Sequence, residues 1–198
     1  MDILTALGLS GSAGLNAYLP LLVVALLARF TSLIHLREPW SALTSGWIIA
    51  VLVILLIVEI VADKVPAVNH VNDVIQTFVR PVAGAILFAA SSNVITDIHP
   101  VLAMVCGLLV AGSVHVVKSA AVRPAVTAIS AAPSGGVATV PANIFVSALE
   151  DIVALVASLI AVIVPAILAL VLLIAVITLG WWLLNQQRAR HRANSGPV

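Results

Sequence analysis

The chain has 198 residues, 62% of them hydrophobic and 9% charged, with a mean hydropathy of +1.22 and a formal net charge of +1. A soluble domain has about 45–50% apolar and about 25% charged residues, so this composition excludes an ordinary soluble protein and indicates helices in a membrane. The near-neutral charge excludes a nucleic-acid partner, because no basic surface is available to displace counterions from phosphates.

The first hydrophobic stretch, residues 3–30, is long enough to span a bilayer, but the sequence GSAGLN interrupts it. We predict helix breaks at Gly14 and Asn16, so that the first third of the stretch forms a separate half-helix. Residues 46–63 follow as an apolar span that is uninterrupted until Glu59 near its end.

Residues 71–90 predict a helix that is amphipathic rather than apolar on all sides. Polar residues recur at steps of four, three and four and form one stripe: Asn69, Asp73, Gln76 and Arg80. The opposite face is hydrophobic: Val71, Val74, Ile75, Phe78, Val79 and Val82. We predict that Pro81 breaks this helix, because proline removes a backbone donor and frees a carbonyl one turn back.

The C-terminal half contains two more predicted spans, residues 99–120 and 166–184. Residues 119–149 are rich in Ala, Ser, Gly and Pro, and they form either an external loop or a re-entrant element. We predict helix breaks there at Pro124, Gly135 and Gly136. A further helix is expected to begin at Glu150 and Asp151 and to lead to Pro165.

These segments predict an all-α polytopic membrane protein with about five spans plus broken or re-entrant helices. Residues 1–187 form one helical transmembrane domain, and residues 188–198 form a basic tail that the positive-inside rule places in the cytoplasm. With an odd number of spans, the N-terminus lies on the other side of the membrane.

Two polar segments resemble each other within the chain. Residues 71–86 and 114–129, aligned without gaps, are identical at seven of sixteen positions, including the run Val-Arg-Pro. Transporter folds often contain such duplications together with discontinuous helices. Because valine and alanine are so frequent in this chain, coincidence in a biased composition remains the alternative to a true internal repeat.

Charged side chains are scarce, yet several lie inside the hydrophobic segments. A carboxylate near the bilayer centre costs about 2.5–3.5 kcal/mol on insertion scales, so such groups persist only when they are paired or solvated. We therefore predict that ten residues meet in a polar centre between helices: Glu59, Asp63, Lys64, Asp73, Arg80, His115, Lys118, Arg123, Glu150 and Asp151. The alternative is that these groups lie separately at helix ends in the membrane interface. For Glu150 and Asp151, complementing a helix dipole is a competing explanation.

The chain carries no recognisable catalytic or metal-binding pattern. No two histidines have metal-ligand spacing with a carboxylate nearby, and no Ser/His/Asp order or phosphate-binding loop stands out. Cys106 is the single cysteine, which excludes an intrachain disulfide. We expect neither an enzyme nor a metal or cofactor.

Four stretches together carry a resemblance to a known family: GSAGLNAYLP (11–20), EIVADKVPAVNHVNDVIQTFVRP (59–81), HVVKSAAVRPAVTA (115–128) and ALEDIVALVASLIAVIVP (148–165). With these elements the chain resembles a bacterial membrane family catalogued as domain of unknown function 4126. The resemblance implies an integral protein of the bacterial inner membrane, in which these polar positions belong to one constellation. It implies no activity.

The leading hypothesis is a channel or transporter for an ion or small polar solute, since charges beside broken helices are typical of such sites. An accessory or scaffolding subunit of a larger membrane complex is the main alternative. A lipid-binding protein, with Arg80 and Arg123 on a head-group phosphate, is a third. With so few spans we expect a homo-oligomer or partner subunits, and the small residues at 107–112 are candidates for the contact.

Overall fold

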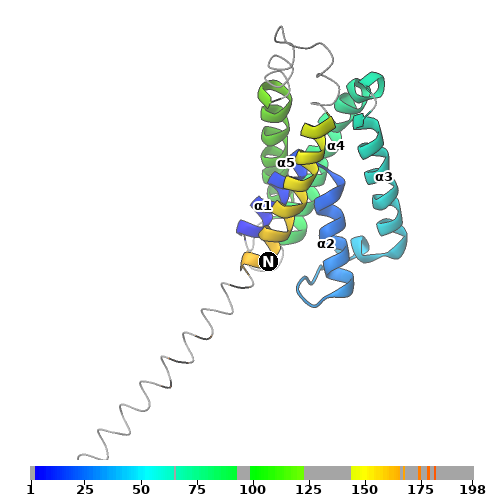
Figure 1. Ribbon diagram of the computed structural model, residues 1–198. Coiled ribbons are helices and arrows are strands. Elements are labelled where there is room, and N and C mark those ends of the chain that lie inside the picture. Colours follow the sequence, from blue (N-terminus) through cyan, green and yellow to red (C-terminus); the bar gives the residue numbers. More distant parts are fainter. Residues whose placement is uncertain are drawn as a thin grey trace, which may run out of the picture. The chain divides into compact units, whose positions relative to one another are not determined.

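The computed structural model (Figure 1) describes residues 3–64, 66–92, 99–122 and 144–165, and four single positions farther on: Ile167, Ile174, Thr178 and Trp181. The chain divides into two compact units, Met1–Val162 and Ile163–Val198. The described residues of the second unit are helical. The residues of the candidate site that the structure describes all lie in the first unit.

The described residues form helices joined by short connections and contain no strand. The elements in chain order are α1 (Ile3–Leu15), α2 (Tyr18–Phe30), the 3₁₀ turn η1 (Trp40–Thr44), α3 (Gly46–Lys64), α4 (Pro66–Ser92), α5 (Pro100–Val117) and the π-helical turn η2 (Lys118–Val122). The unlabelled helix Ile144–Pro165 follows (Figure 1).

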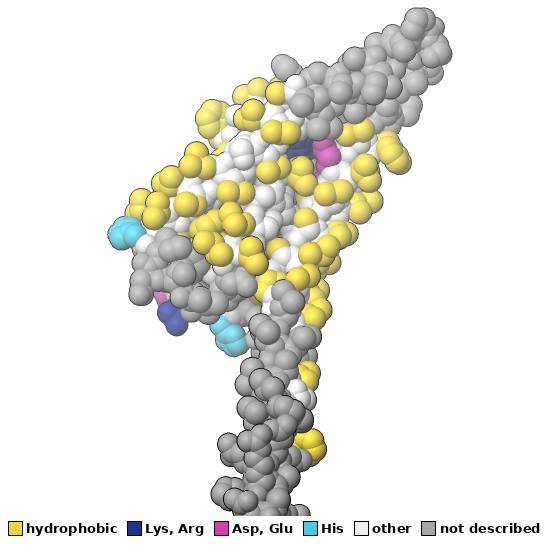
Figure 2. All heavy atoms as spheres, turned by 90° about the vertical axis from the view of Figure 1, so that its left-hand side faces the viewer, with side chains coloured by type: hydrophobic (Ala, Val, Ile, Leu, Met, Phe, Trp, Pro, Cys, Tyr) yellow, Lys and Arg dark blue, Asp and Glu magenta, His cyan; other side chains and the backbone are white. Residues whose placement is uncertain are grey.

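Four segments are long and apolar enough to cross a membrane: Gly46–Asp63, Val71–Ser91, Pro100–Ala120 and Ile144–Pro165. On the face drawn in Figure 2, hydrophobic side chains cover most of the described surface, and few charged atoms are visible. The predicted all-α membrane architecture is therefore confirmed, and the chain is an integral membrane protein.

The first hydrophobic stretch is divided into two short helices of 13 residues each. Asn16 and Ala17 lie between α1 and α2, where the sequence predicts a break. Gly14 lies inside the last turn of α1, so the helix ends after it rather than at it. A Cβ at Gly14 would come within 2.6 Å of the Ala111 carbonyl oxygen, which shows how closely α1 approaches α5.

Although short, α1 packs against α4, α5 and the helix Ile144–Pro165. The Ser10 hydroxyl donates to the Gly84 carbonyl of α4 at 3.0 Å. On another side, the hydroxyl oxygens of Ser12 and Ser158 lie 2.7 Å apart, and each is 2.6 Å from the Ala154 carbonyl oxygen. Small polar residues thus join helices at close range, as is common where water is excluded.

The predicted break at Pro81 is wrong, because α4 continues through this proline from Pro66 to Ser92. Proline forfeits one backbone hydrogen bond, and burial of the following turns offsets that loss. Ala83, Leu87 and Phe88 are all buried, and α4 packs against both α1 and α5.

The amphipathic pattern of α4 is oriented with its polar stripe towards the other helices. Gln76 and Arg80 are buried, and Asp73 is partly buried. The residues of the hydrophobic face are exposed, Phe78 by 73% of its surface, with the exception of the partly buried Val79. This orientation is the reverse of that in a soluble protein, and it suits a helix whose outer face meets lipid.

The small residues of α5 serve contacts within the chain. A Cβ at Gly84 of α4 would collide with the Ala111 side chain and the Gly107 carbonyl oxygen. Gly107 and Ala111 are both buried in this contact. Gly107 and Ala111 therefore bring α4 and α5 together, while a contact between copies through residues 107–112 stays a prediction.

The segment 119–149 is helical at both described ends, since η2 ends at Val122 and the next helix begins at Ile144. The remainder lies outside the described residues, with Arg123, Pro124, Gly135 and Gly136. The first half of the candidate repeat, 71–86, is helical throughout, and its second half is described only as far as residue 122. Most of the predicted span 166–184 and the whole tail 188–198 also lie outside the described residues.

Candidate functional site

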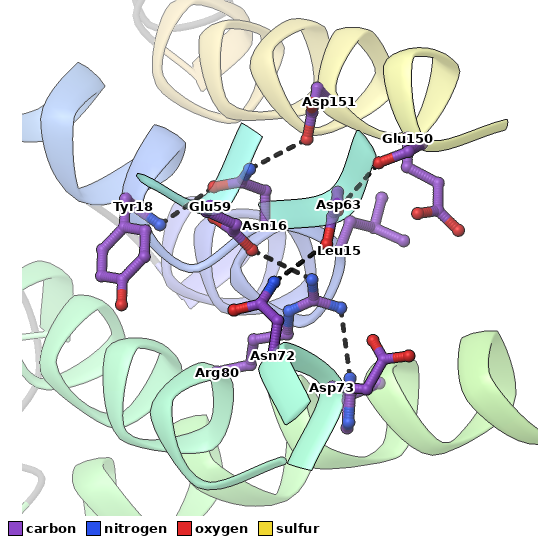
Figure 3. A network of polar contacts seen from close by, with 12 residues as sticks. Leu15, Asn16, Tyr18, Glu59, Asp63, Asn72, Asp73, Arg80, Glu150 and Asp151 are labelled. Atoms are coloured by element: carbon purple, nitrogen blue, oxygen red, sulfur yellow. Dashed lines mark hydrogen bonds and ion pairs between the residues drawn. The ribbon is translucent and has the colours of Figure 1, made fainter. Parts of the chain in front are cut away.

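A buried ion pair joins α3 and α4. The Arg80 Nη2 atom lies 3.0 Å from Glu59 Oε1, and the two side chains are 1% and 2% exposed (Figure 3). Both residues lie within segments long enough to span a membrane. Burying each charge alone would cost several kcal/mol, so their contact explains how a carboxylate and a guanidinium persist there.

The same arginine connects α4 to α5 through His115. Arg80 Nη1 lies 3.2 Å from His115 Nδ1, and because a guanidinium can only donate, this ring nitrogen must accept. The proton of the neutral imidazole is then on Nε2, which donates to the Thr77 hydroxyl at 3.2 Å. Thr77 donates in turn to the Asp73 backbone carbonyl at 2.8 Å. Every hydrogen bond in this chain of contacts therefore has one donor and one acceptor.

Asp63, one helical turn after Glu59, is held by uncharged partners. Its Oδ1 accepts a hydrogen bond from the Asn72 amide at 2.9 Å, and its Oδ2 accepts one from the Ser147 hydroxyl at 2.8 Å. The carboxylate is 7% exposed. Through these uncharged partners it joins three helices, α3, α4 and Ile144–Pro165.

Asn16, at the break between α1 and α2, has two roles. Its side-chain oxygen accepts from the backbone N–H groups of Tyr18 and Leu19, each at 3.0 Å, which caps the first turn of α2. Its amide nitrogen donates to Asp151 Oδ1 at 2.9 Å. The break is thereby tied to the helix Ile144–Pro165, as Figure 3 shows.

Lys118, at the start of η2, binds the other side of the same break. Its ammonium group donates to the Leu15 carbonyl at 3.0 Å and lies 2.6 Å from Glu150 Oε2. The last carbonyls of a helix have no partner within it and carry partial negative charge, so a cation there is favourable. The end of α1 is therefore bound by Lys118 from a later element, and the start of α2 is capped by Asn16, which Asp151 holds in turn.

These contacts define the polar cluster, which consists of Asn16, Glu59, Asp63, Asn72, Arg80, His115, Lys118, Ser147, Glu150 and Asp151, together with Gln76, the buried polar residue one turn before Arg80 on α4. Within the described part of the chain, five of its buried atoms have no hydrogen-bond partner: Glu59 Oε2, Gln76 Oε1, Arg80 Nε and the two carboxylate oxygens of Glu150. Of these, Glu150 Oε2 lies in the ion pair with Lys118. Buried polar atoms are usually satisfied, so those at Glu59, Gln76 and Arg80 leave binding capacity inside the cluster.

The structure brings together seven of the ten residues predicted for the polar centre: Glu59, Asp63, Arg80, His115, Lys118, Glu150 and Asp151. Asp73 lies beside them on α4, partly buried and labelled in Figure 3, and its backbone carbonyl ends the chain of contacts from Arg80. Arg123 and the side chain of Lys64 lie outside the described residues.

Sequence reasoning missed the uncharged members of the cluster. Asn16 was expected as a helix break and not as a partner of Asp151, while Asn72 and Ser147 were not expected at all. Gln76 was assigned to the polar stripe without a role. A usable signal exists for Asn72, because an amide is unusual in so apolar a chain and stands beside Asp73 of the stripe.

The cluster contains carboxylates, cations and amides. No group of three or more His, Cys, Asp or Glu side chains converges on one point within the described residues. The arrangement suits the binding of a proton or of a small polar group that uses one or two hydrogen bonds.

The chain belongs to the family described as a domain of unknown function (DUF4126), which matches residues 3–186. The resemblance seen in the sequence is therefore confirmed over nearly the whole chain. No curated protein and no solved structure matches it.

Proposed function

We propose that this member of the DUF4126 family passes an ion or a small polar solute across the membrane through the polar cluster. The observation that carries the proposal is the group of buried, unpartnered atoms at Glu59, Gln76 and Arg80. A network that only locks a fold gains most when every donor and acceptor is satisfied. Unsatisfied atoms in a spanning region fit a site that exchanges a ligand.

The helix break supports the same proposal. Transporters often build midplane sites from discontinuous helices, whose free ends bind substrate or coupling ions. Here the end of α1 binds Lys118 and the start of α2 is capped by Asn16. These contacts hold the two helix ends with side chains, and rearranging the side chains would free the ends without unfolding either helix.

The proposal extends to topology and assembly. We place the C-terminal tail in the cytoplasm and the protein in a bacterial inner membrane, with the arginines after residue 187 as the supporting feature. Association with a second copy or with partner subunits is part of the proposal, because the exposed hydrophobic faces of α3 and α4 suit other helices as well as lipid.

The second candidate is an accessory subunit in which the cluster is a structural lock. The ion pairs Arg80–Glu59 and Lys118–Glu150 favour it, since both join helices that are distant in sequence. Purification in mild detergent discriminates between the candidates: a stable complex with a foreign protein supports the accessory role, and a pure homo-oligomer supports passage. The burial of Arg80 and its contacts with Glu59 and His115 speak against a lipid phosphate at this residue.

A flux assay in liposomes tests the proposal. The purified protein should release or exchange at least one member of a panel of common inorganic ions, and Glu59→Gln should lower that flux by an order of magnitude or more. Glu38→Gln is the matched control, because Glu38 is exposed in the connection between α2 and α3. Absence of flux for every member of the panel, or an equal flux in Glu59→Gln, would overturn the proposal.

A further inference from the structure

The two carboxylate oxygens of Glu59 have different surroundings. Oε1 accepts a hydrogen bond from Arg80 at 3.0 Å, whereas Oε2 has no partner within the described residues. The side chain is 2% exposed, so bulk water does not satisfy the second oxygen. A deprotonated Glu59 thus leaves an unsatisfied anionic acceptor in the interior, which is costly.

A second acceptor close by has the same deficiency. Gln76 is 2% exposed, and its Oε1 atom has no partner within the described residues. Tyr18 of α2 lies within electrostatic reach of both groups. Two buried acceptors without a partner among the described residues therefore lie around one tyrosine. A proton on Glu59 converts one acceptor into a donor.

Acidic side chains outnumber basic ones among the described members of the polar cluster, which are Glu59, Asp63, Glu150 and Asp151 against Arg80 and Lys118. The charged groups that face Glu59 are Arg80 from α4, Asp63 from α3 and Asp151 from the helix Ile144–Pro165. Tyr18 faces it from α2, and His115 of α5 lies behind Arg80. Among these described groups, uptake of positive charge reduces the repulsion between carboxylates.

We propose that Glu59 binds and releases a proton during passage, so that the proton is the coupling ion of this protein. The proposal rests on the proposed function and adds the identity of the coupling ion. In the loading step a new O–H bond forms at Glu59 Oε2 while an O–H bond of a hydronium ion breaks, and water leaves. Release reverses the step, and no electron is transferred.

A metal cation fits the site less well than a proton. Cations such as Na⁺ or Mg²⁺ require several oxygen ligands around one point, and the described residues provide no such group of three acidic or histidine side chains. The guanidinium of Arg80, 3.0 Å from the other oxygen of Glu59, repels a second full cation. A proton needs one oxygen, and that oxygen is present.

Infrared spectroscopy of the purified protein in lipid tests the proton site directly. As the pH is lowered, the carbonyl stretch of a protonated carboxylic acid should appear, be absent from Glu59→Gln and persist in Glu38→Gln. Gln76→Leu is the second variant, and it should shift the frequency of this band without removing it. If no band assignable to Glu59 appears anywhere in the pH range of the folded protein, the proton site is overturned.

Flux measurements test the coupling. An imposed proton gradient should drive substrate flux. Over the pH range in which Glu59 titrates, the flux should change by up to about tenfold per pH unit, as expected for a single proton. Two results would overturn this inference and leave the proposed function standing. One is substrate flux without an infrared band of protonated Glu59, and the other is flux that a sodium gradient drives and a proton gradient does not. A Glu59 band without any flux overturns the proposed function, and the coupling with it.

Discussion

Helices α4 and α5 meet in two different ways, one turn apart. At the glycine contact, formed by Gly84, Gly107 and Ala111, backbone atoms of the two helices approach so closely that no side chain fits between them. At the polar contact, Arg80 and Thr77 reach across to His115 through side chains of defined donor and acceptor direction. The same two helices therefore carry a contact of apolar packing beside a contact of buried charge.

The difference shows what each contact contributes. The glycine contact has its polar atoms engaged in helical backbone bonds and gains packing energy at little cost. The polar contact is expensive, because burying an ion pair often contributes less than an apolar pair of the same volume. Such a pair, with no partner for Glu59 Oε2 and Arg80 Nε among the described residues, supports the proposal that this region serves function more than stability.

Removing one charge of the ion pair should have the largest effect on stability. Arg80→Met leaves Glu59 buried and unpaired, which is expected to cost about 3–5 kcal/mol of unfolding free energy. Equilibrium unfolding in detergent measures the loss. Arg37→Met is the control, because Arg37 is exposed in the connection between α2 and α3, and it should change stability by less than about 0.5 kcal/mol. Equal effects of the two substitutions would contradict the burial of Arg80.

Filling the glycine contact should have the next largest effect. A Cβ at Gly107 would come within 2.6 Å of Phe88 Cβ and 2.8 Å of Ala85 Cα, so Gly107→Ala should destabilise by about 1–3 kcal/mol. Gly112→Ala on the same helix is the matched control, since the nearest atom to its new Cβ, in Pro81, is 3.7 Å away. The midpoint of thermal unfolding should fall only for Gly107→Ala. A fall of the same size in both variants would show that helix propensity, not packing, is measured.

Removing the cap at the break between α1 and α2 should have an intermediate effect. Asn16→Ala loses the bonds to Tyr18 and Leu19 and is expected to cost about 0.5–2 kcal/mol. Asn16→Asp retains the cap but places a second carboxylate beside Asp151. Because that repulsion disappears when Asp151 is protonated, Asn16→Asp should gain stability relative to wild type as the pH is lowered. A constant difference at every pH would contradict the contact with Asp151.

The smallest effect is expected at the end of the chain of contacts from Arg80. Thr77→Val removes the acceptor of His115 Nε2 and should cost about 1 kcal/mol, the usual net value of one hydrogen bond. Thr77→Ser restores the hydroxyl and should recover most of this loss. A stability of Thr77→Val equal to that of the wild type would contradict a contribution from this hydrogen bond.

Much of the fold followed from patterns that depend on local sequence. The uninterrupted apolar run of α3, the stripe on α4 and the interruption GSAGLN each predicted an element that the structure contains. The cost of charge in lipid was sufficient to predict that Glu59 and Arg80 meet. These inferences needed no knowledge of which helices are neighbours.

The errors concern features that depend on neighbouring helices. Pro81 lies inside a continuous helix because packing of the following turns outweighs one lost bond. Gly107 and Ala111 pack against α4 within the chain, a use that the sequence pattern does not distinguish from a contact between copies. Ser147, the hydroxyl partner of Asp63, carries no charge and so gives no signal against lipid.

The most direct test replaces the Glu59–Arg80 pair with an apolar pair. Glu59→Leu combined with Arg80→Met leaves no unpaired charge at this contact, so the double variant should fold and be as stable as wild type or more stable, by up to about 4 kcal/mol. Its liposome flux should nevertheless be lost. A folded double variant that retains full flux would contradict a role for the pair in passage, and a double variant that fails to fold would assign the pair to structure alone.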